Sequence, residues 1–177
     1  MTLCRYITAL LLAVTVLLSV SAQEKGNKGE SLKRLMELPS FERAILIVKH
    51  YETLHSPAHW PYIGYGHRVR EGEPYKKGVR LTERQADALL RRDLRERCAT
   101  FRRFGRDSLL LSALAYQVGE ARLLGGGKLR KSKLAGRLEA GDRDIYREYI
   151  SFRKWRGRTV SSIGTRRKVE YLLLFEP

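Results

Sequence analysis

The sequence predicts a mostly helical α+β domain that carries one small β-hairpin. Three stretches indicate this fold class. Residues 41–52 have the apolar spacing of a helix, residues 60–66 combine strand-favouring side chains with two glycines, and residues 108–118 carry no charge. The 177 residues suffice for one domain with a real core and are too few for two of ordinary size.

The first 22 residues are expected to be a signal peptide. Arg5 supplies a positive n-region, residues 7–20 are apolar, and small side chains at residues 20–22 favour cleavage after Ala22. An uncleaved membrane anchor is the alternative, although the apolar run is shorter than the ~20 residues of a spanning helix. The mature protein is therefore expected to be exported, to the periplasm or the exterior. Its only contact with the membrane would be through this peptide.

Two further regions follow the signal peptide. Residues 23–38 mix Lys, Glu, Gly and Ser, which predicts a flexible lead-in whose leucines can form one turn against the domain. Residues 39–177 are then the folded domain. After cleavage its single cysteine, Cys98, excludes an internal disulfide, and a small buried hydrophobe is its expected role.

The chain is strongly basic, with a net charge of +16 that changes by only one if Arg5 is removed. So basic a protein needs an anionic partner. Nucleic acid is the first candidate for a cytosolic chain, whereas the expected export favours the anionic polymers of the cell wall and argues against nucleic acid. Binding of anionic lipid is another alternative, but the charge-free residues 108–118 indicate a packed core instead.

Glu52 is the first candidate for a catalytic residue. On the expected helix it continues an apolar face formed by Phe41, Ile45 and Val48. Partial burial and the carbonyl end of the helix both disfavour the ionised carboxylate. A carboxyl group kept protonated near neutral pH is suited to general acid catalysis, and a solvated charge is the ordinary alternative.

The residues after Glu52 predict a hairpin beside it. Ser56-Pro57 interrupts the helix, residues 60–65 favour strand, and Gly64 and Gly66 permit close approach of a backbone or a sugar. A helix, a loop and a hairpin would then form one wall of a cleft, with Glu52 at its bottom. His67 follows this turn, and a hydrogen bond to a backbone carbonyl is a slightly simpler role for it than chemistry.

The second half is predicted to be helical. Thr82-Glu83-Arg84-Gln85 is a capping box, and it starts a helix that ends near Phe104. The inward residues of this helix are expected to be Leu90, Leu94, Cys98 and Phe101. Residues 108–118 form a buried central helix that ends at Gly119.

Three shorter helices are expected to complete the chain, over residues 132–140, 142–155 and 165–175. Arg166, Arg167 and Lys168 stand at the expected start of the last helix, where they oppose its dipole. They therefore form either a surface patch or a contact with substrate.

No metal site and no cofactor site is expected. The four histidines, His50, His55, His59 and His67, have spacings that match no standard zinc signature. Gly125-Gly126-Gly127 lacks the strand and helix that flank a phosphate-binding loop.

Five motifs in order resemble the phage-type lysozymes, the endolysin family of glycoside hydrolases (family 24). They are IGYGH at 63–67, TERQADALLRRDL at 82–94, ALAYQVG at 113–119, LRKSKLAGRLEAGD at 129–142 and FRKW…GTRRKVEYLLL at 152–174. The resemblance covers residues 39–176. It implies a lysozyme-like fold with a β-hairpin lobe and a helical lobe flanking a sugar-binding cleft. The implied substrate is peptidoglycan, cut at the β-1,4 bond between N-acetylmuramic acid and N-acetylglucosamine.

The resemblance also implies site residues. Glu52, at the end of the first helix of the domain, matches the catalytic acid, which protonates the glycosidic oxygen. Gln117 and Glu120 would border the cleft, and Arg166 is a further candidate for substrate contact. The aromatic residues Trp60, Tyr65 and Trp155 either stack on sugar rings or pack in the core. Nothing in the sequence requires more than a monomer.

The sequence departs from the family at the second carboxylate. Phage-type lysozymes usually carry an aspartate between the glutamate and the GYGH segment, followed by a threonine that helps to place the attacking water. Residues 53–66 contain no Asp or Glu, and Tyr62 stands where the threonine is expected.

Three alternatives follow from this departure. Another group can place the water, and the candidates are His59, Tyr62, His67, Glu71 and Glu73. The enzyme can instead be a lytic transglycosylase, in which the 6-hydroxyl of the muramic sugar attacks and leaves an anhydro end. The third alternative is a wall-binding protein without activity.

Overall fold

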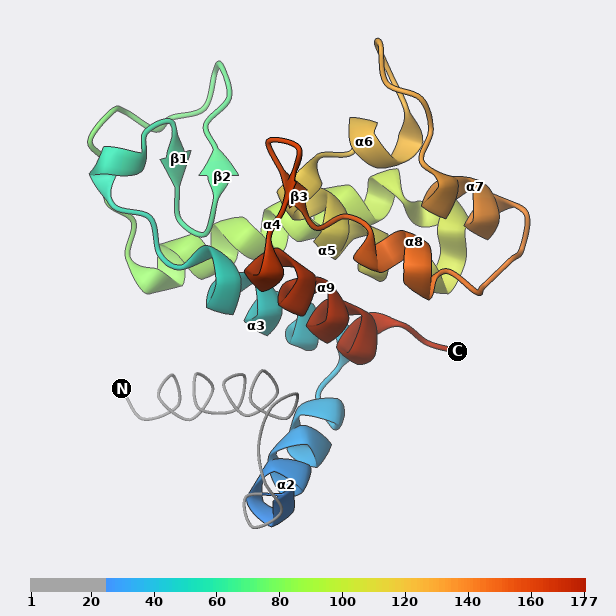
Figure 1. Cartoon of the computed structure of the whole chain (residues 1–177). Coiled ribbons are helices and arrows are strands. Elements are labelled where there is room, and N and C mark those ends of the chain that lie inside the picture. The colour runs from blue at the N-terminus through green and yellow to red at the C-terminus, as the bar shows by residue number, and fades with distance from the viewer. Residues whose placement is uncertain (1–24) are drawn as a thin grey trace.

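The computed structural model describes residues 25–177, with side chains from residue 29 onward, so the expected signal peptide lies outside the described residues. Figure 1 shows a small lobe that carries β1 and β2 beside a larger helical part. The predicted class, a mostly helical α+β fold, is confirmed. In chain order the elements are α2 (Lys25–Met36), α3 (Ser40–Glu52), η2 (Pro57–His59), β1 (Tyr62–Ile63), β2 (His67–Arg68), α4 (Glu83–Thr100), η3 (Arg102–Asp107), α5 (Ser108–Val118), α6 (Ala121–Leu124), α7 (Lys133–Glu139), α8 (Tyr146–Ile150), β3 (Lys154–Trp155), β4 (Arg158–Thr159) and α9 (Ser161–Leu174).

The helix α2 corrects the expectation of a flexible lead-in over residues 23–38. Its twelve residues are helical, and the leucines in its last turns provide the reason. Leu35 is fully buried, and Leu32 and Leu38 pack against the core. Leu32 and Leu35 lie on one face of α2, and Leu38 follows just beyond its end, so the expected apolar contact with the domain forms at the C-terminal end of the helix.

The helix α3 and the hairpin form as predicted. Ile45 and Val48 of α3 are buried, and the helix ends at Glu52 because Thr53 takes a backbone φ of +54°. In the hairpin, β1 and β2 pair antiparallel, with Ile63 opposite His67. The three residues of the turn lie between them, so the hairpin is short and tight.

The capping box of α4 is confirmed. The Thr82 hydroxyl accepts a hydrogen bond from the Gln85 backbone N–H, and the Gln85 side chain accepts one from the Thr82 backbone N–H at 2.9 Å. The expected inward residues Leu90, Leu94 and Phe101 are buried. Cys98 is half-buried, and the helix ends at Thr100 rather than near Phe104, since the 3-10 helix η3 continues the chain.

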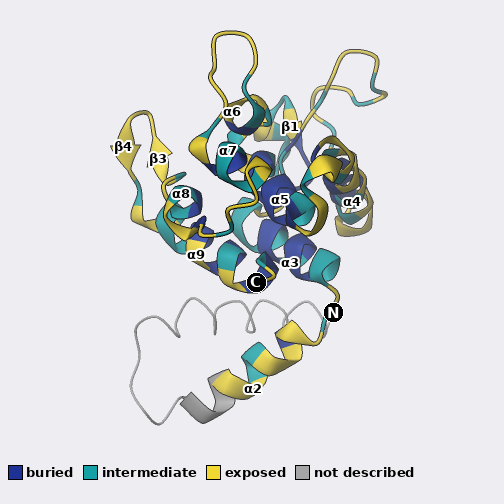
Figure 2. Cartoon of the chain, turned by 90° about the vertical axis from the view of Figure 1, so that its right-hand side faces the viewer, coloured by how far each residue is buried: buried dark blue, intermediate teal, exposed yellow. Residues whose placement is uncertain are grey.

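The helix α5 is the centre of the core, as predicted for a segment without charge. Its bounds are those expected, Gly119 caps its C-terminal end, and the six residues from Leu110 to Ala115 are buried. Figure 2 shows this buried helix surrounded by more exposed elements. It packs against α4 on one side and α9 on another, while α9 also lies along α3.

The expected helix over residues 142–155 is wrong. Only α8 is helical there, and the chain then forms the hairpin of β3 and β4. Asp142 accepts a hydrogen bond from the Asp144 backbone N–H at 2.9 Å, so it stabilises a turn rather than a helix start. The two-residue turn Arg156-Gly157 has positive φ at both positions, which is the geometry that joins two short strands.

The last helix, α9, begins at Ser161 and not at Thr165, four residues earlier than predicted. Arg166 and Arg167 therefore lie in its second turn and are buried, whereas Lys168 is exposed. The expectation that Arg166 and Arg167 stand at a helix start, where they could form a surface patch, is wrong, because the earlier start rotates both side chains inward.

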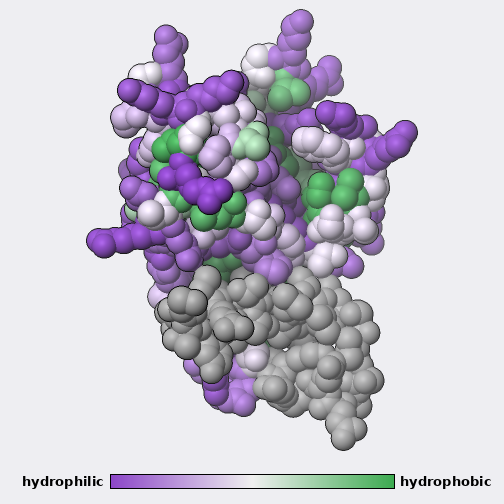
Figure 3. Space-filling model, turned by 90° about the vertical axis from the view of Figure 1, so that its left-hand side faces the viewer, coloured by the Kyte–Doolittle hydropathy of each residue, from purple (hydrophilic) through white to green (hydrophobic). Residues whose placement is uncertain are grey.

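Within the described residues, no helix combines the length and the apolar character that crossing a membrane requires. The face on the side of β1 and β2 is mostly hydrophilic and carries separate small apolar areas (Figure 3).

Candidate active site

Glu52 lies where α3 ends and the chain turns towards the hairpin. Its side chain is 22 % exposed, and the Arg166 guanidinium, which is 2 % exposed, donates from Nη1 to Glu52 Oε1. The same guanidinium lies over the ring of Tyr51, 5.3 Å from its centroid. The sequence argument considered only burial and the helix end, and the structure adds a direct contact with a buried guanidinium.

A buried ion network holds Arg166 in place. Glu170, one turn along α9, accepts from Arg166 Nε at 2.8 Å and from Arg167 Nη1 at 2.5 Å. The Tyr149 hydroxyl donates to the same carboxylate at 2.9 Å. Arg167 also donates to the side-chain oxygen of Gln117 at the end of α5. Since all of these groups are fixed by packing and by each other, the orientation of Glu52 is fixed as well.

The hairpin turn lies against the other oxygen of Glu52. Gly66 has a backbone φ of +97°, and a methyl group at this position would lie 3.6 Å from both Glu52 Oε2 and the Tyr116 ring. The Tyr116 hydroxyl donates to the Tyr65 carbonyl at 3.0 Å, which ties the turn to α5. Arg166 thus holds Oε1, and Oε2 faces the glycine turn.

Replacing Gly66 with alanine is expected to reduce both stability and activity. The positive φ should cost more than about 1 kcal/mol of stability. The added methyl would occupy the space beside Oε2 and should lower activity on the peptidoglycan that the resemblance implies by about tenfold or more, since a small displacement of the substrate is costly. Thermal unfolding and a turbidity assay on cell walls would measure the two effects.

The matched control for Gly66→Ala is Gly72→Ala. Gly72 has a φ of +85°, but a methyl group added there would have no atom within 4 Å. This variant should lose a similar amount of stability and keep its activity. Equal activity losses in the two variants would contradict the claim that Gly66 affects activity through its place beside Glu52 Oε2.

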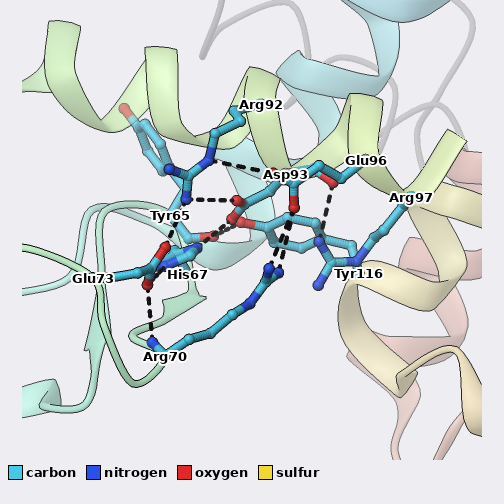
Figure 4. Close-up of polar contacts among 9 residues, drawn as sticks. All are labelled: Tyr65, His67, Arg70, Glu73, Arg92, Asp93, Glu96, Arg97 and Tyr116. Carbon is cyan, nitrogen blue, oxygen red and sulfur yellow. Dashed lines mark hydrogen bonds and ion pairs between the residues drawn. The ribbon is translucent and has the colours of Figure 1, made fainter. Parts of the chain in front are cut away.

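A second polar cluster ties the hairpin to α4. The buried ring of His67 lies between two carboxylates, with Nδ1 2.7 Å from Asp93 Oδ2 and Nε2 2.7 Å from Glu73 Oε2. Glu73 also accepts from the Arg70 backbone N–H at 2.9 Å and from Arg92 Nη2 at 3.0 Å. Figure 4 shows these side chains converging between the loop after β2 and the helix α4. We call His67, Glu73, Asp93 and Arg92 the His67 cluster.

Contacts within the His67 cluster shift the pKa values of His67 and Glu73. Burial of the ring lowers the pKa of His67, but the hydrogen bonds to Asp93 and Glu73 outweigh it, and the net pKa is raised. Partial burial raises the pKa of Glu73, but the Arg70 N–H and His67 outweigh it and lower this pKa to about 2. The imidazolium therefore donates to both carboxylates. The expected bond from His67 to a backbone carbonyl is replaced by two ion pairs.

Comparison with known proteins decides the family. The phage lysozyme family model matches residues 48–170, a span that includes Glu52, the hairpin and Arg166. The chain belongs to the phage lysozyme family. No curated protein matches the chain. Membership of the phage lysozymes implies a glycosidase that degrades peptidoglycan, and it confirms the resemblance noted in the sequence.

Two of the three auxiliary candidates lie together in the β lobe of this phage lysozyme. His59 is exposed, and its Nδ1 accepts from the Ser56 backbone N–H at 3.1 Å, so its ring closes the short helix η2. Tyr62 is exposed on β1. The ring of His55 lies near the ring of His59 and near the ring of Tyr62. His67 is separate from this aromatic group, in its own cluster.

The candidates for substrate contact differ in their surroundings. Tyr65 is buried, with Lys49 over its ring at 5.2 Å, which favours the core-packing alternative. Trp155 is exposed on β3, which favours stacking on a ligand. Gln117 is held by Arg167, and Glu120 is half-buried at the start of α6. Arg166 contacts Glu52 rather than solvent.

The second carboxylate of the phage lysozymes has no obvious substitute among the candidates from the sequence. Glu73 is committed to His67 and Arg92. Glu71 is exposed in the same loop. Among the residues that the structure describes, no group of three or more His, Cys, Asp or Glu side chains is arranged to hold a metal ion.

Sequence reasoning missed Asp93 and Glu170, which hold His67 and Arg166. Local signals for both were present. Asp93 stands three residues after Leu90 on the inward face of α4, where an acid is unusual unless it is paired. Glu170 stands four residues after Arg166, a spacing at which opposite charges meet on a helix.

Proposed function

We propose that this phage lysozyme cleaves the β-1,4 bond between N-acetylmuramic acid and N-acetylglucosamine, with Glu52 as the general acid. The observation that carries the proposal is the fixed carboxyl group: Arg166 holds Oε1, and Oε2 is turned towards the glycine turn of the hairpin. In this proposal Oε2 carries the proton that passes to a glycosidic oxygen beside the turn. When Glu52 has given its proton, the Arg166 guanidinium stabilises the carboxylate that forms.

Hydrolysis is the first form of this reaction. A water attacks the sugar as the bond to the leaving oxygen breaks, and the exposed Tyr62 and His59 of the β lobe are the groups proposed to position that water. The Tyr62 hydroxyl can accept a hydrogen bond from water, and His59, whose Nδ1 accepts from Ser56, can donate one from Nε2, although neither group is a carboxylate. The proposal includes export of the mature protein after removal of residues 1–22, because peptidoglycan lies outside the cytoplasm.

One observation favours a second candidate, the lytic transglycosylase. Glu73 is bound by His67 and Arg92 and is therefore not free to activate a water. A transglycosylase needs only the acid, since the 6-hydroxyl of the muramic sugar attacks the same carbon and leaves an anhydro end. Glu52 then takes the proton from that hydroxyl after giving its own to the leaving oxygen.

Mass spectrometry of the released muropeptides tests the proposal. Purified peptidoglycan is incubated with the mature protein recovered from producing cells, whose mass also shows whether residues 1–22 are absent. Reducing muramic ends would establish hydrolysis, and anhydro ends would establish the transglycosylase. Absence of any product that depends on Glu52 would contradict both and leave a wall-binding protein.

A further inference from the structure

The hairpin of β1 and β2 has a buried face and an outward face. Ile63 and His67 lie opposite each other and are buried, and His67 points towards α4 (Figure 4). Side chains alternate along a strand, so Tyr62 and its partner Arg68 lie on the other face, and both are exposed. Directly opposite residues have Cβ atoms about 5 Å apart. The hairpin thus presents a tyrosine and an arginine side by side on its outward face.

Arg68 is a cation without an acid beside it. Residues 53–70 contain no Asp or Glu. In the part of the chain that the structure describes, no acid forms an ion pair with Arg68, whereas Arg70 reaches Glu96 at 3.5 Å. The guanidinium of Arg68 is therefore available to an anion from outside the protein.

The neighbouring polar side chains are also hydrogen-bond donors. His59 Nδ1 accepts from the Ser56 backbone N–H at 3.1 Å, so the neutral ring carries its proton on Nε2. The ring of His55 links His59 to the hairpin, with centroids 4.8 Å from the His59 ring and 6.5 Å from the Tyr62 ring. We call Arg68, Tyr62 and His59 the hairpin donor set. Guanidinium, phenol and imidazole N–H groups suit a carboxylate or a phosphate, whose ionised oxygens only accept.

The backbone around the hairpin donor set is held in place. The His55 backbone N–H donates to the Gly64 carbonyl at 2.8 Å, and the Val69 backbone N–H donates to the Pro61 carbonyl at 2.9 Å. These bonds tie the loop that carries His59 to the hairpin. Donors fixed in this way lose less conformational freedom when a ligand binds.

The hairpin donor set lies near Glu52. A methyl group at Gly66 would be 3.6 Å from Glu52 Oε2, and Gly66 precedes Arg68 by two residues. The two backbone positions are at most about 7 Å apart, since an extended chain spans about 3.5 Å per residue. The proposed function already places Tyr62 and His59 beside the reacting sugar. An anion bound by Arg68 therefore belongs to the glycan strand itself.

We propose that Arg68 binds a negative group on a muramic sugar near the bond that is cut, and that it thereby selects glycan strands that carry such a group. Tyr62 and His59 donate to the same oxygens. Muramic acid can carry this charge as its lactyl carboxylate, where no peptide is attached, or as a phosphate ester on its 6-oxygen. The proposal rests on the proposed function, because it requires the sugar to lie beside Glu52. Arg68 determines specificity and takes no part in bond cleavage.

Titration calorimetry with soluble glycan strands tests the proposal. All proteins are recovered from producing cells and carry Glu52→Gln, so that the strands stay intact. The first probe has free lactyl carboxylates, the second has these carboxylates converted to methyl amides, and the third is the amidated strand with phosphate on the muramic 6-oxygen. The parent should bind the first or the third about fivefold more tightly than the neutral second, a factor limited by the exposure of Arg68. The probe that is preferred identifies the anion, and high salt should reduce the preference.

Three variants assign the preference to Arg68. Arg68→Gln should bind all three strands with the affinity of the parent for the neutral strand, and Arg68→Lys should keep part of the preference because it keeps the charge. The matched control Arg80→Gln removes the same charge at an exposed position of the following loop and should keep the full preference. Thermal unfolding of each variant shows that the fold is retained.

Two results would overturn the proposal. One is a parent that binds neither anionic strand more tightly than the neutral strand. The other is an equal loss of preference in Arg80→Gln and Arg68→Gln, because net charge alone would then explain the binding. These readouts need no bond cleavage, so a failure of the proposed reaction would appear only in the product analysis.

Discussion

Replacing Glu52 with glutamine is expected to lower the rate of peptidoglycan cleavage by about 10²–10⁴-fold. The amide has nearly the same shape, but it has no proton to give to the glycosidic oxygen. Arg166 can still donate to the amide oxygen, so the change removes the acid and keeps the contact. Initial rates of cell-wall clearing, normalised to the amount of folded protein, would measure the effect.

Glu37→Gln is the matched control for this experiment. It makes the same chemical change at an exposed glutamate beyond the end of α2, far along the chain from the hairpin. Its rate should equal that of the parent. If Glu52→Gln kept more than about a tenth of the parent rate, Glu52 would not be the general acid.

The second large effect is expected on stability, when His67 is replaced. Replacing it with asparagine should lower the free energy of unfolding by about 3–5 kcal/mol, the usual cost of removing one partner from a buried ion pair. The variant leaves Asp93 buried at 1 % exposure without its imidazolium, and it breaks the link between the hairpin loop and α4. Guanidinium unfolding near pH 5.5 would measure this loss of stability, with His55→Gln, at a half-buried histidine outside the cluster, for comparison.

The same cluster predicts how stability depends on pH. The pKa of His67 is raised above its ordinary 6.5, so its contribution is complete below that value and is lost as pH rises through the folded-state pKa. The pKa of Glu73 falls from 4.5 to about 2, so its contribution is present above 4.5 and is lost as pH falls towards 2. The contribution of both groups is therefore greatest between pH 4.5 and 6.5.

A series of unfolding measurements across pH would show this maximum. In His67→Asn the decline above pH 6.5 should disappear, because no imidazolium remains to be lost. Wild-type stability that rises steadily from pH 6.5 to pH 9 would contradict the double ion pair of His67.

Local patterns in the sequence were sufficient for several elements near the site. The apolar spacing through Ile45 and Val48 placed Glu52 at the end of α3, and the capping box placed the start of α4. The charge-free residues of α5 predicted its buried position. In each case the signal involves residues within about three helical turns, so it is readable without knowledge of the fold.

The errors have a local explanation as well. The helix expected over residues 142–155 ignored the turn signal Arg156-Gly157, which favours a hairpin. The helix α9 begins without a side-chain cap, so no residue type marked its start at Ser161. Missing that start by four residues placed Arg166 and Arg167 at a helix start, as a surface patch or a contact with substrate, whereas both are buried.

The sequence by itself determined the fold class, the family resemblance and the placement of a glutamate between an apolar helix and a glycine turn. Only the tertiary structure decided which groups act on that glutamate. Arg166 lies 114 residues from Glu52, and Asp93 lies 26 residues from His67. Helix periodicity relates residues a few positions apart, whereas these pairs meet because α9 packs along α3 and the hairpin folds onto α4.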